Sequence, residues 1–173
     1  MLNFLPKKTP SPAHAGISAL PSVAILYFKN NTGDKNLDMW RDGLCTLMIS
    51  KLQQSRFIRV VDQTQMYSVL KKMNRLEQGN YTPEDLKEIA SRTLATHVVR
   101  GSLTKAGDQY RIELTVQNAP KLEIIAAENA DGTGEGNILA MVDDLAERLK
   151  SKIGLAPGQI ETDIRYNLGS GLT

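Results

Sequence analysis

The sequence has little of the chemistry that most catalytic and metal sites need. Its 173 residues include one cysteine and two histidines. A lone cysteine, Cys45, excludes an intramolecular disulfide and any site built on several cysteines, and such a residue more often fills an apolar position than acts as a nucleophile. His14 and His97 are far apart in the sequence, so no histidine cluster can seed a zinc site or a triad. We therefore predict no catalytic residues, no metal and no cofactor.

Long hydrophobic runs are also missing. No stretch approaches the roughly 18 apolar residues that cross a bilayer, so we predict no membrane insertion by this segment. The opening MLNFLPKK is too short for a secretory signal, and its charges follow its apolar residues. Four prolines in residues 1–21 predict a linker. We expect one domain over 22–155 and a short helix or an exit linker over 156–173, as in a piece of a longer protein.

Charge is unevenly distributed although its sum is only +2. Residues 51–75 hold six basic side chains and one acid, whereas residues 123–147 hold seven acids and no base. This asymmetry predicts either oppositely charged faces or ordinary solvated helix faces.

Apolar periodicity predicts the first half of the fold. The run Val23–Phe28 is continuously apolar, which indicates a buried strand at the centre of a sheet. An amphipathic helix is predicted over 37–54, and a strand over 57–61. Asp62 or Thr64 is expected to begin the next helix. Thr82 followed by Pro83 then marks a third helix start, which is the clearest in the sequence.

The period changes to two after His97, which predicts a β-hairpin with Gly107-Asp108 at its turn. A third strand over 122–129, a flexible DGTGEG turn over 131–136 and a helix over 136–153 are expected to follow. On the second strand, Arg111, Glu113 and Thr115 share one face. The order β-α-β-α-α-β-β-β-α predicts an α+β fold with a mixed sheet of about five strands.

The segment NNTGDKNLD, from Asn30, invites comparison with a phosphate-binding loop. It has a single glycine, Gly33, and no Gly-Lys-Ser/Thr, and its acids would repel a phosphate. Asp34, Asp38 and Asp42 also lack the spacing of a calcium loop. We interpret the segment as a turn in which Asp38 supports the helix start. Nucleotide or small-ligand binding over 30–38 remains an alternative, and Asn31, Gly33, Asp34 and Asp38 form a candidate interaction loop.

A second candidate is the basic patch Lys71, Lys72 and Arg75, predicted on the outer side of one helix. Three cations with few aromatics are a weak signal for nucleic acid, so nucleic-acid binding is unlikely to be the function and stands only as a second alternative. An exposed edge of the hairpin sheet could also accept a strand from a partner.

Several segments in order resemble a known family. PSVAILYFKNNTGD, MWRDGLCTLMISKL, FIRVVDQTQMYSVLKKM and EDLKEIASRTLATHVVRGSLTKAGDQYRIELTVQN are similar to the TolB N-terminal-like domain, in the wider set that includes CsgG and FlgO-type domains. The resemblance covers about Pro21 to Leu155. Its most specific features are N-x-x-G-D after the first strand, and V-x-G-S leading to G-D-x-Y-R. The sequence departs from the pattern after Asn118, where Ala-Pro replaces the usual turn.

The resemblance implies a non-catalytic sensory or protein-interaction module of a bacterial signalling protein. Such domains accompany serine/threonine kinase, adenylate cyclase or winged-helix regulator domains, often before tetratricopeptide repeats or a β-propeller. The expected partners are other domains of the same polypeptide or another protein. The parent protein could be membrane-anchored, and the extracytoplasmic side is favoured over the cytoplasm.

Overall fold

Six strands form one mixed sheet in the computed structural model, which describes residues 20–77 and 79–170. The strands are β1 (Ser22–Ile25), β2 (Lys29–Asn30), β3 (Arg59–Val60), β4 (His97–Ala106), β5 (Gln109–Asn118) and β6 (Ile124–Thr133). Their order is β3-β1-β4-β5-β6, and β2 also pairs with β4. The pairs among β1, β2, β3 and β4 are parallel, whereas β4, β5 and β6 are antiparallel. The predicted α+β class is confirmed.

The helices follow the predicted order, with short additions. They are η1 (Lys35–Leu37), α1 (Met39–Gln53), α2 (Gln63–Lys72), α3 (Pro83–Thr93), η2 (Glu135–Asn137), α4 (Ile138–Lys152) and α5 (Pro157–Ser170). The segment 156–173, for which a helix or a linker was expected, is helical from Pro157 to Ser170. The linker predicted over 1–21 lies outside the described residues except for Leu20 and Pro21.

Strand β1 lies inside the sheet, as its apolar run predicts. All four of its residues are buried, and α1 and α3 both contact it. The strand is shorter than predicted. Leu26 still donates its amide to the Val99 carbonyl of β4 at 3.0 Å, whereas Tyr27 and Phe28 stay buried outside any strand. The Phe28 amide donates to the Arg41 carbonyl of α1 at 3.1 Å instead of to a strand.

Gly101 leaves room for the Phe28 side chain at this point. A β-carbon built on Gly101 would lie 2.2 Å from Cε1 of Phe28, so the ring occupies the space of the missing side chain. The glycine of V-x-G-S is therefore required by close packing against Phe28.

Side-chain caps define two helix starts. Asp62, rather than Thr64, caps α2, because its carboxylate accepts from the Gln65 amide at 2.8 Å. At α3, the Thr82 hydroxyl accepts from the Asp85 amide at 3.1 Å, and the Thr82 amide donates to the Asp85 carboxylate at 2.9 Å. This reciprocal capping box confirms the predicted start of α3.

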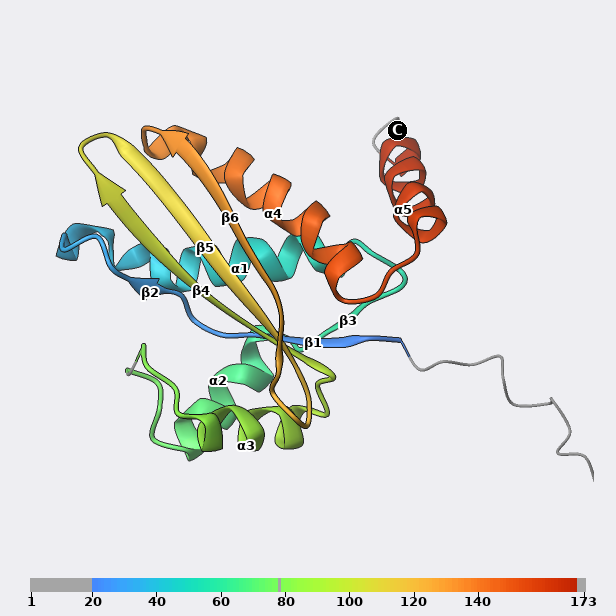
Figure 1. Ribbon diagram of the computed structural model, residues 1–173, viewed down its shortest axis with the longest axis horizontal. Coiled ribbons are helices and arrows are strands. Elements are labelled where there is room, and N and C mark those ends of the chain that lie inside the picture. Colours follow the sequence, from blue (N-terminus) through green and yellow to red (C-terminus); the bar gives the residue numbers. More distant parts are fainter. Residues whose placement is uncertain (1–19, 78, 171–173) are drawn as a thin grey trace, which may run out of the picture.

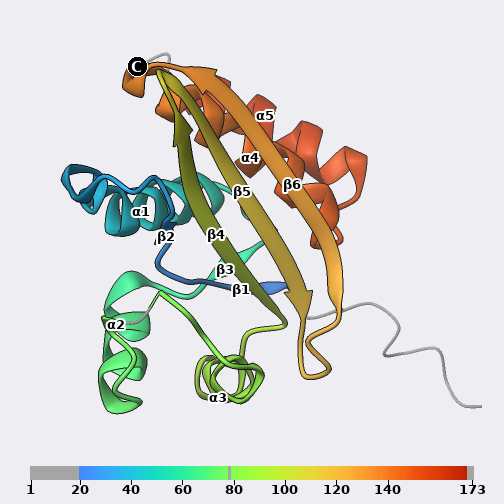
Figure 2. The ribbon, with the colours of Figure 1, turned by 60° about the vertical axis from the view of Figure 1, so that its left-hand side comes forward.

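The long strands have one covered and one open face. Helices α1 and α4 pack together and lie behind the sheet in Figure 1, whereas α2 and α3 lie toward its β1 end (Figures 1 and 2). Register places the apolar pairs Val99 with Val116 and Leu103 with Ile112 on the covered face. The opposite side, here called the open face, carries Arg100, Ser102, Thr104, Arg111, Glu113, Thr115, Ala127, Asn129 and Asp131.

Strand β6 is longer than predicted. It continues to Thr133, so Asp131–Thr133 belongs to the sheet and is not part of a flexible turn. Gly132 makes this possible, because a β-carbon there would lie 2.7 Å from the Met141 sulfur of α4. The antiparallel pairing with β5 therefore extends along the whole of β6.

The acids of α4 form ion pairs, so the second of the two alternatives, ordinary solvated helix faces, does not describe them fully. Asp143 lies 2.8 Å from Nζ of Lys51 on α1, and Asp144 lies 2.7 Å from the Arg148 guanidinium. Glu147 pairs with Lys150 at 2.9 Å. The acidic C-terminal segment therefore meets the basic segment through Lys51 and also pairs with bases of its own helix.

Candidate functional site

The loop from Asn30 to Asp38 is closed by its own polar groups. The Asn30 side chain accepts from the Thr32 amide at 3.0 Å and from the Thr32 hydroxyl at 2.6 Å. Its amide nitrogen donates to the Asp34 carbonyl at 2.9 Å and to the Asp38 carboxylate at 2.7 Å. One side chain thus holds both ends of the loop, as in an Asx turn.

The four residues of the candidate interaction loop have different roles. Asp34 caps η1 by accepting from the Asn36 amide at 2.9 Å. Gly33 adopts φ +78°, which favours glycine. Asp38 precedes α1 but makes no side-chain capping bond, because its carboxylate accepts from Asn30. It can support the helix start only through its negative charge near the helix N-terminus. Asn31 is exposed, and its backbone amide donates to the Leu103 carbonyl at 2.8 Å.

The predicted basic patch is not a single surface of α2. That helix ends at Lys72, so Arg75 lies beyond it. The Arg75 Nε donates to both carboxylate oxygens of Asp85 at 3.0 Å. Lys71 lies 6.0 Å from the Tyr67 ring centre, and Lys72 is exposed. Arg75 therefore anchors the capping box of α3 and does not belong to the same helix as Lys71 and Lys72.

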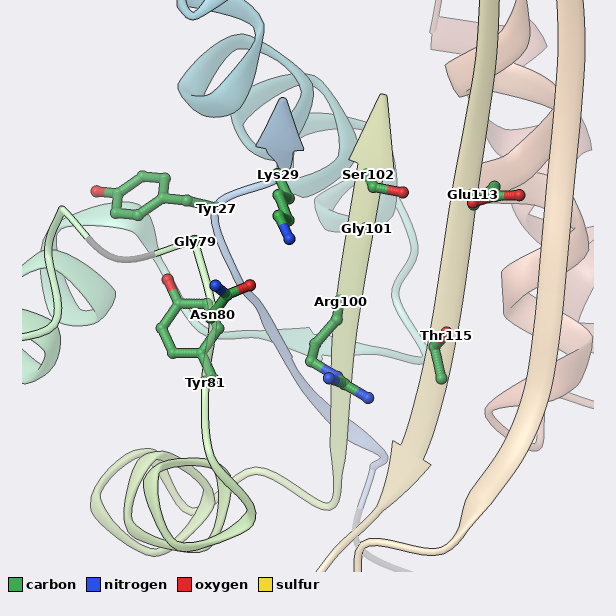
Figure 3. A pocket seen from close by; sticks show the side chains of 10 residues that line it. All are labelled: Tyr27, Lys29, Gly79, Asn80, Tyr81, Arg100, Gly101, Ser102, Glu113 and Thr115. Atoms are coloured by element: carbon green, nitrogen blue, oxygen red, sulfur yellow. The ribbon is translucent and has the colours of Figure 1, made fainter. Parts of the chain in front are cut away.

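A groove beside β4 gathers residues that the sequence did not bring together. It has a volume of about 260 Å³. Its floor is the open face of β4 and β5, and the segment 79–81 faces β4 across it (Figure 3). The groove, here called the Arg100 groove, is lined by Tyr27, Lys29, Gly79, Asn80, Tyr81, Arg100, Gly101, Ser102, Glu113 and Thr115.

Two polar atoms in the Arg100 groove have no partner among the described residues. They are Nε of Arg100 and the hydroxyl of Tyr81, and both are shielded from solvent. Burial raises the pKa of Tyr81 to about 12, so its hydroxyl stays protonated at neutral pH. A buried donor without an acceptor costs about 1–3 kcal/mol. Such groups are uncommon in native proteins and point to a missing partner.

The charges of the groove are two cations and one anion. Lys29 comes from β2, Arg100 from β4 and Glu113 from β5. None of the three belongs to an ion pair among the residues that the structure describes. The nearby Arg111, by contrast, pairs with Asp131 at 2.6 Å on the same open face. The groove therefore carries an uncompensated positive charge.

The potential nucleophiles are occupied by structural contacts. Cys45 is buried, its Sγ lies 3.5 Å from the Ile25 carbonyl, and burial raises its pKa to about 12, as expected for an apolar position. The Thr96 hydroxyl contacts Nδ1 of His97 at 2.9 Å but also bonds both backbone groups of Ser22. Within residues 20–77 and 79–170, no cluster of side chains suited to a metal ion is present.

The sequence carried part of the signal for the groove. Alternation placed Glu113 and Thr115 on one face of their strand, and the same alternation in β4 would have added Arg100 and Ser102. Nothing in the sequence pattern shows that Tyr81, just before α3, lies beside β4 and lines the same groove. Its place depends on how α3 packs against the sheet.

Comparisons with known proteins establish similarity of fold. No family model matches the chain, and a search of curated proteins finds no match. Among solved structures, the LpoB C-terminal domain from Escherichia coli has a TM-score of 0.52 and 14% identity over 70% of this chain and 89% of that one. The lipoprotein GNA1162 from Neisseria meningitidis has a TM-score of 0.55 and 13% identity over 75% and 96%.

A TolB structure from Acinetobacter baumannii is also found, at 14% identity over 78% of this chain and 27% of that one, but its TM-score of 0.46 is too low to carry an argument. The chain therefore shares its fold with the LpoB domain and GNA1162, whereas membership of the TolB N-terminal-like family stays a prediction. No helix in the described part of the chain is long and apolar enough to cross a membrane.

Proposed function

We propose that this chain is a non-catalytic protein-binding module that docks a partner on the open face of β4, β5 and β6. The observation that carries the proposal is the face itself. Helices α1 and α4 cover one side of the long strands, while polar side chains line the other side. That side includes a groove with two donors that have no partner in the described part of the chain. Polar, partly charged surfaces with a few desolvated donors suit a non-obligate partner.

The fold supports this proposal. It is shared with the LpoB C-terminal domain and with GNA1162, which is named as a lipoprotein. A membrane-anchored parent with this domain on its extracytoplasmic side is consistent with that likeness. The link to kinase, cyclase or regulator domains and to tetratricopeptide repeats rests on the family resemblance alone.

A photo-crosslinking residue on the open face tests the proposal. Ala127 is exposed on the open face, and Ser50 is an exposed control on α1, which covers the opposite side. The full chain carrying the crosslinker at either position would be expressed in the bacterium that produces it. We expect one discrete adduct from position 127 that position 50 does not form. Equal adducts from both positions, or none from position 127, would overturn the proposal.

The two alternative functions have less support. Ligand binding over 30–38 would require polar groups that the loop already uses internally, and nucleic-acid binding would require Arg75, which Asp85 holds. Calorimetry with ATP, GTP and cyclic nucleotides, with and without magnesium, is expected to show no heat. Retention on nucleic acid is expected not to change when Lys71 and Lys72 are neutralised.

A further inference from the structure

We infer that the Arg100 groove binds a single carboxylate, presented by an extended peptide segment of the partner. The inference rests on the proposed function and names the chemistry that this face recognises. Its starting point is the Arg100 guanidinium, whose Nε is buried and has no acceptor among the described residues. Arg111 on the same open face differs, because it pairs with Asp131. Arg148 of α4 also has a buried Nε without a partner, but its terminal nitrogens pair with Glu128 and Asp144, whereas Arg100 has no ion pair among the described residues.

The geometry of a guanidinium selects its acceptor. Nε–H and one terminal N–H form a fork that matches the two oxygens of a carboxylate or phosphate. The Tyr81 hydroxyl is a second buried donor, and Lys29 adds a positive charge from β2, which pairs with β4 (Figure 3). Ser102 and Thr115 add hydroxyls to the groove floor. A ligand that accepts several hydrogen bonds and carries negative charge would satisfy these groups together.

Glu113 decides between the two kinds of anion. Its carboxylate lies on the groove floor and has no ion pair among the described residues. With Lys29 and Arg100 it leaves a net charge of about +1, which balances one carboxylate but not a phosphate dianion. Glu113 can also accept a hydrogen bond from a backbone N–H. A peptide segment offers both groups, because its backbone N–H follows its carboxylate within a few ångströms.

NMR on the full chain tests the inference, since the Arg100 Nε–H can be observed directly. The probes are acetyl-Gly-Glu-Gly-amide, its Gln counterpart, acetyl-Gly-Gly-Gly with a free C-terminus, and inorganic phosphate. We expect the Arg100 Nε–H signal to shift with the Glu peptide or the free C-terminus, and the stronger of the two identifies the source of the carboxylate. The Gln peptide should leave the signal unchanged.

Matched variants show whether the response comes from the groove. Arg100→Gln and Lys29→Gln should each weaken binding at least about tenfold, as expected for loss of a charged hydrogen bond. Binding would be followed through the Ser102 and Thr115 backbone amides. The control Lys105→Gln removes an exposed cation of β4 outside the groove and should leave binding unchanged. If Arg100→Gln does not fold, Lys29→Gln provides the same test.

Several results would overturn the inference. They are no shift with any carboxylate probe at millimolar concentration, an equal response to the Gln peptide, equal losses in Lys29→Gln and Lys105→Gln, or tighter binding of phosphate. Failure here would leave the crosslinking result at position 127 intact. Conversely, carboxylate binding without an adduct at position 127 would support the Arg100 groove as a carboxylate site and would overturn the proposal that a partner docks on the open face.

Discussion

The Asn30–Asp38 loop and the Arg100 groove are both polar, but their polar groups are in opposite states. In the loop, Asn30 bonds Thr32, Asp34 and Asp38, so the polar atoms satisfy each other. In the groove, Nε of Arg100 and the Tyr81 hydroxyl have no partner among the described residues. Polar groups that are already paired hold a fold together, whereas shielded donors without acceptors need a further partner, which can be a water or a ligand.

The largest loss of stability is expected from a substitution of Gly101, which lines the Arg100 groove. Gly101→Ala would place a methyl group where the Phe28 ring lies, and we expect it to destabilise the protein by about 1–3 kcal/mol. Urea denaturation measures the loss. The double variant Phe28→Leu/Gly101→Ala should lose less than the sum of the single variants, because the smaller side chain leaves room. Additive losses would show that the two residues do not compete for space.

Substitution of Asn30 tests whether the internal hydrogen bonds of the Asn30–Asp38 loop stabilise the protein. Asn30→Ala removes the side chain that bonds both ends of the loop, and it should cost about 1–2 kcal/mol. The neighbouring Asn31→Ala removes an exposed side chain and should change stability by no more than about 0.5 kcal/mol. Thermal unfolding of both variants measures the difference. Equal effects would mean that the loop does not depend on its internal bonds.

The wall of the groove depends on Asp85, which holds the chain just after Tyr81. Burial disfavours its charged form, but hydrogen bonds from Thr82 and Arg75 outweigh this and lower its pKa below the ordinary 3.8. Asp85→Asn should cost about 1 kcal/mol at neutral pH.

The pH dependence of this effect follows from the lowered pKa. The carboxylate contributes stability above the ordinary pKa, and that contribution is lost as pH falls through the lower pKa of the folded state. Wild type and Asp85→Asn should therefore converge in acid, as followed by urea denaturation from neutral pH downward. A constant difference would show that the charge of Asp85 is not involved.

The smallest change in stability is expected at Tyr81 of the groove. Its direction should be opposite to that of Asn30→Ala in the loop, or the change should be absent. Tyr81→Phe removes a buried hydroxyl that has no partner among the described residues, so stability should stay the same or rise by up to about 1 kcal/mol. Thermal unfolding checks this against Asn30→Ala. A clear loss of stability in Tyr81→Phe would show that the hydroxyl is satisfied within the protein.

Local patterns in the sequence were enough for most elements. The apolar run at β1, the Thr82-Pro83 start of α3 and the alternation around Gly107 each depend on residues close in the chain, so they could be predicted. The errors came where distant segments meet. Phe28 leaves its strand where its amide bonds α1 and its ring packs on Gly101, and Asp131–Thr133 joins β6 because it pairs with β5 and packs on α4.

The sequence by itself determined the α+β class, the order of the elements and the polar face of the hairpin, because periodicity and capping act over a few residues. Only the tertiary structure decided which polar residues have partners. Asn30 and Asp38 meet across a loop, and Arg75 meets Asp85 across a turn, so their charges and donors are used internally. Lys29, Tyr81 and Arg100 come together from separate segments, with no hydrogen-bond acceptor or ion pair for them among the described residues. Hydrogen-bond satisfaction depends on geometry that the linear sequence does not contain.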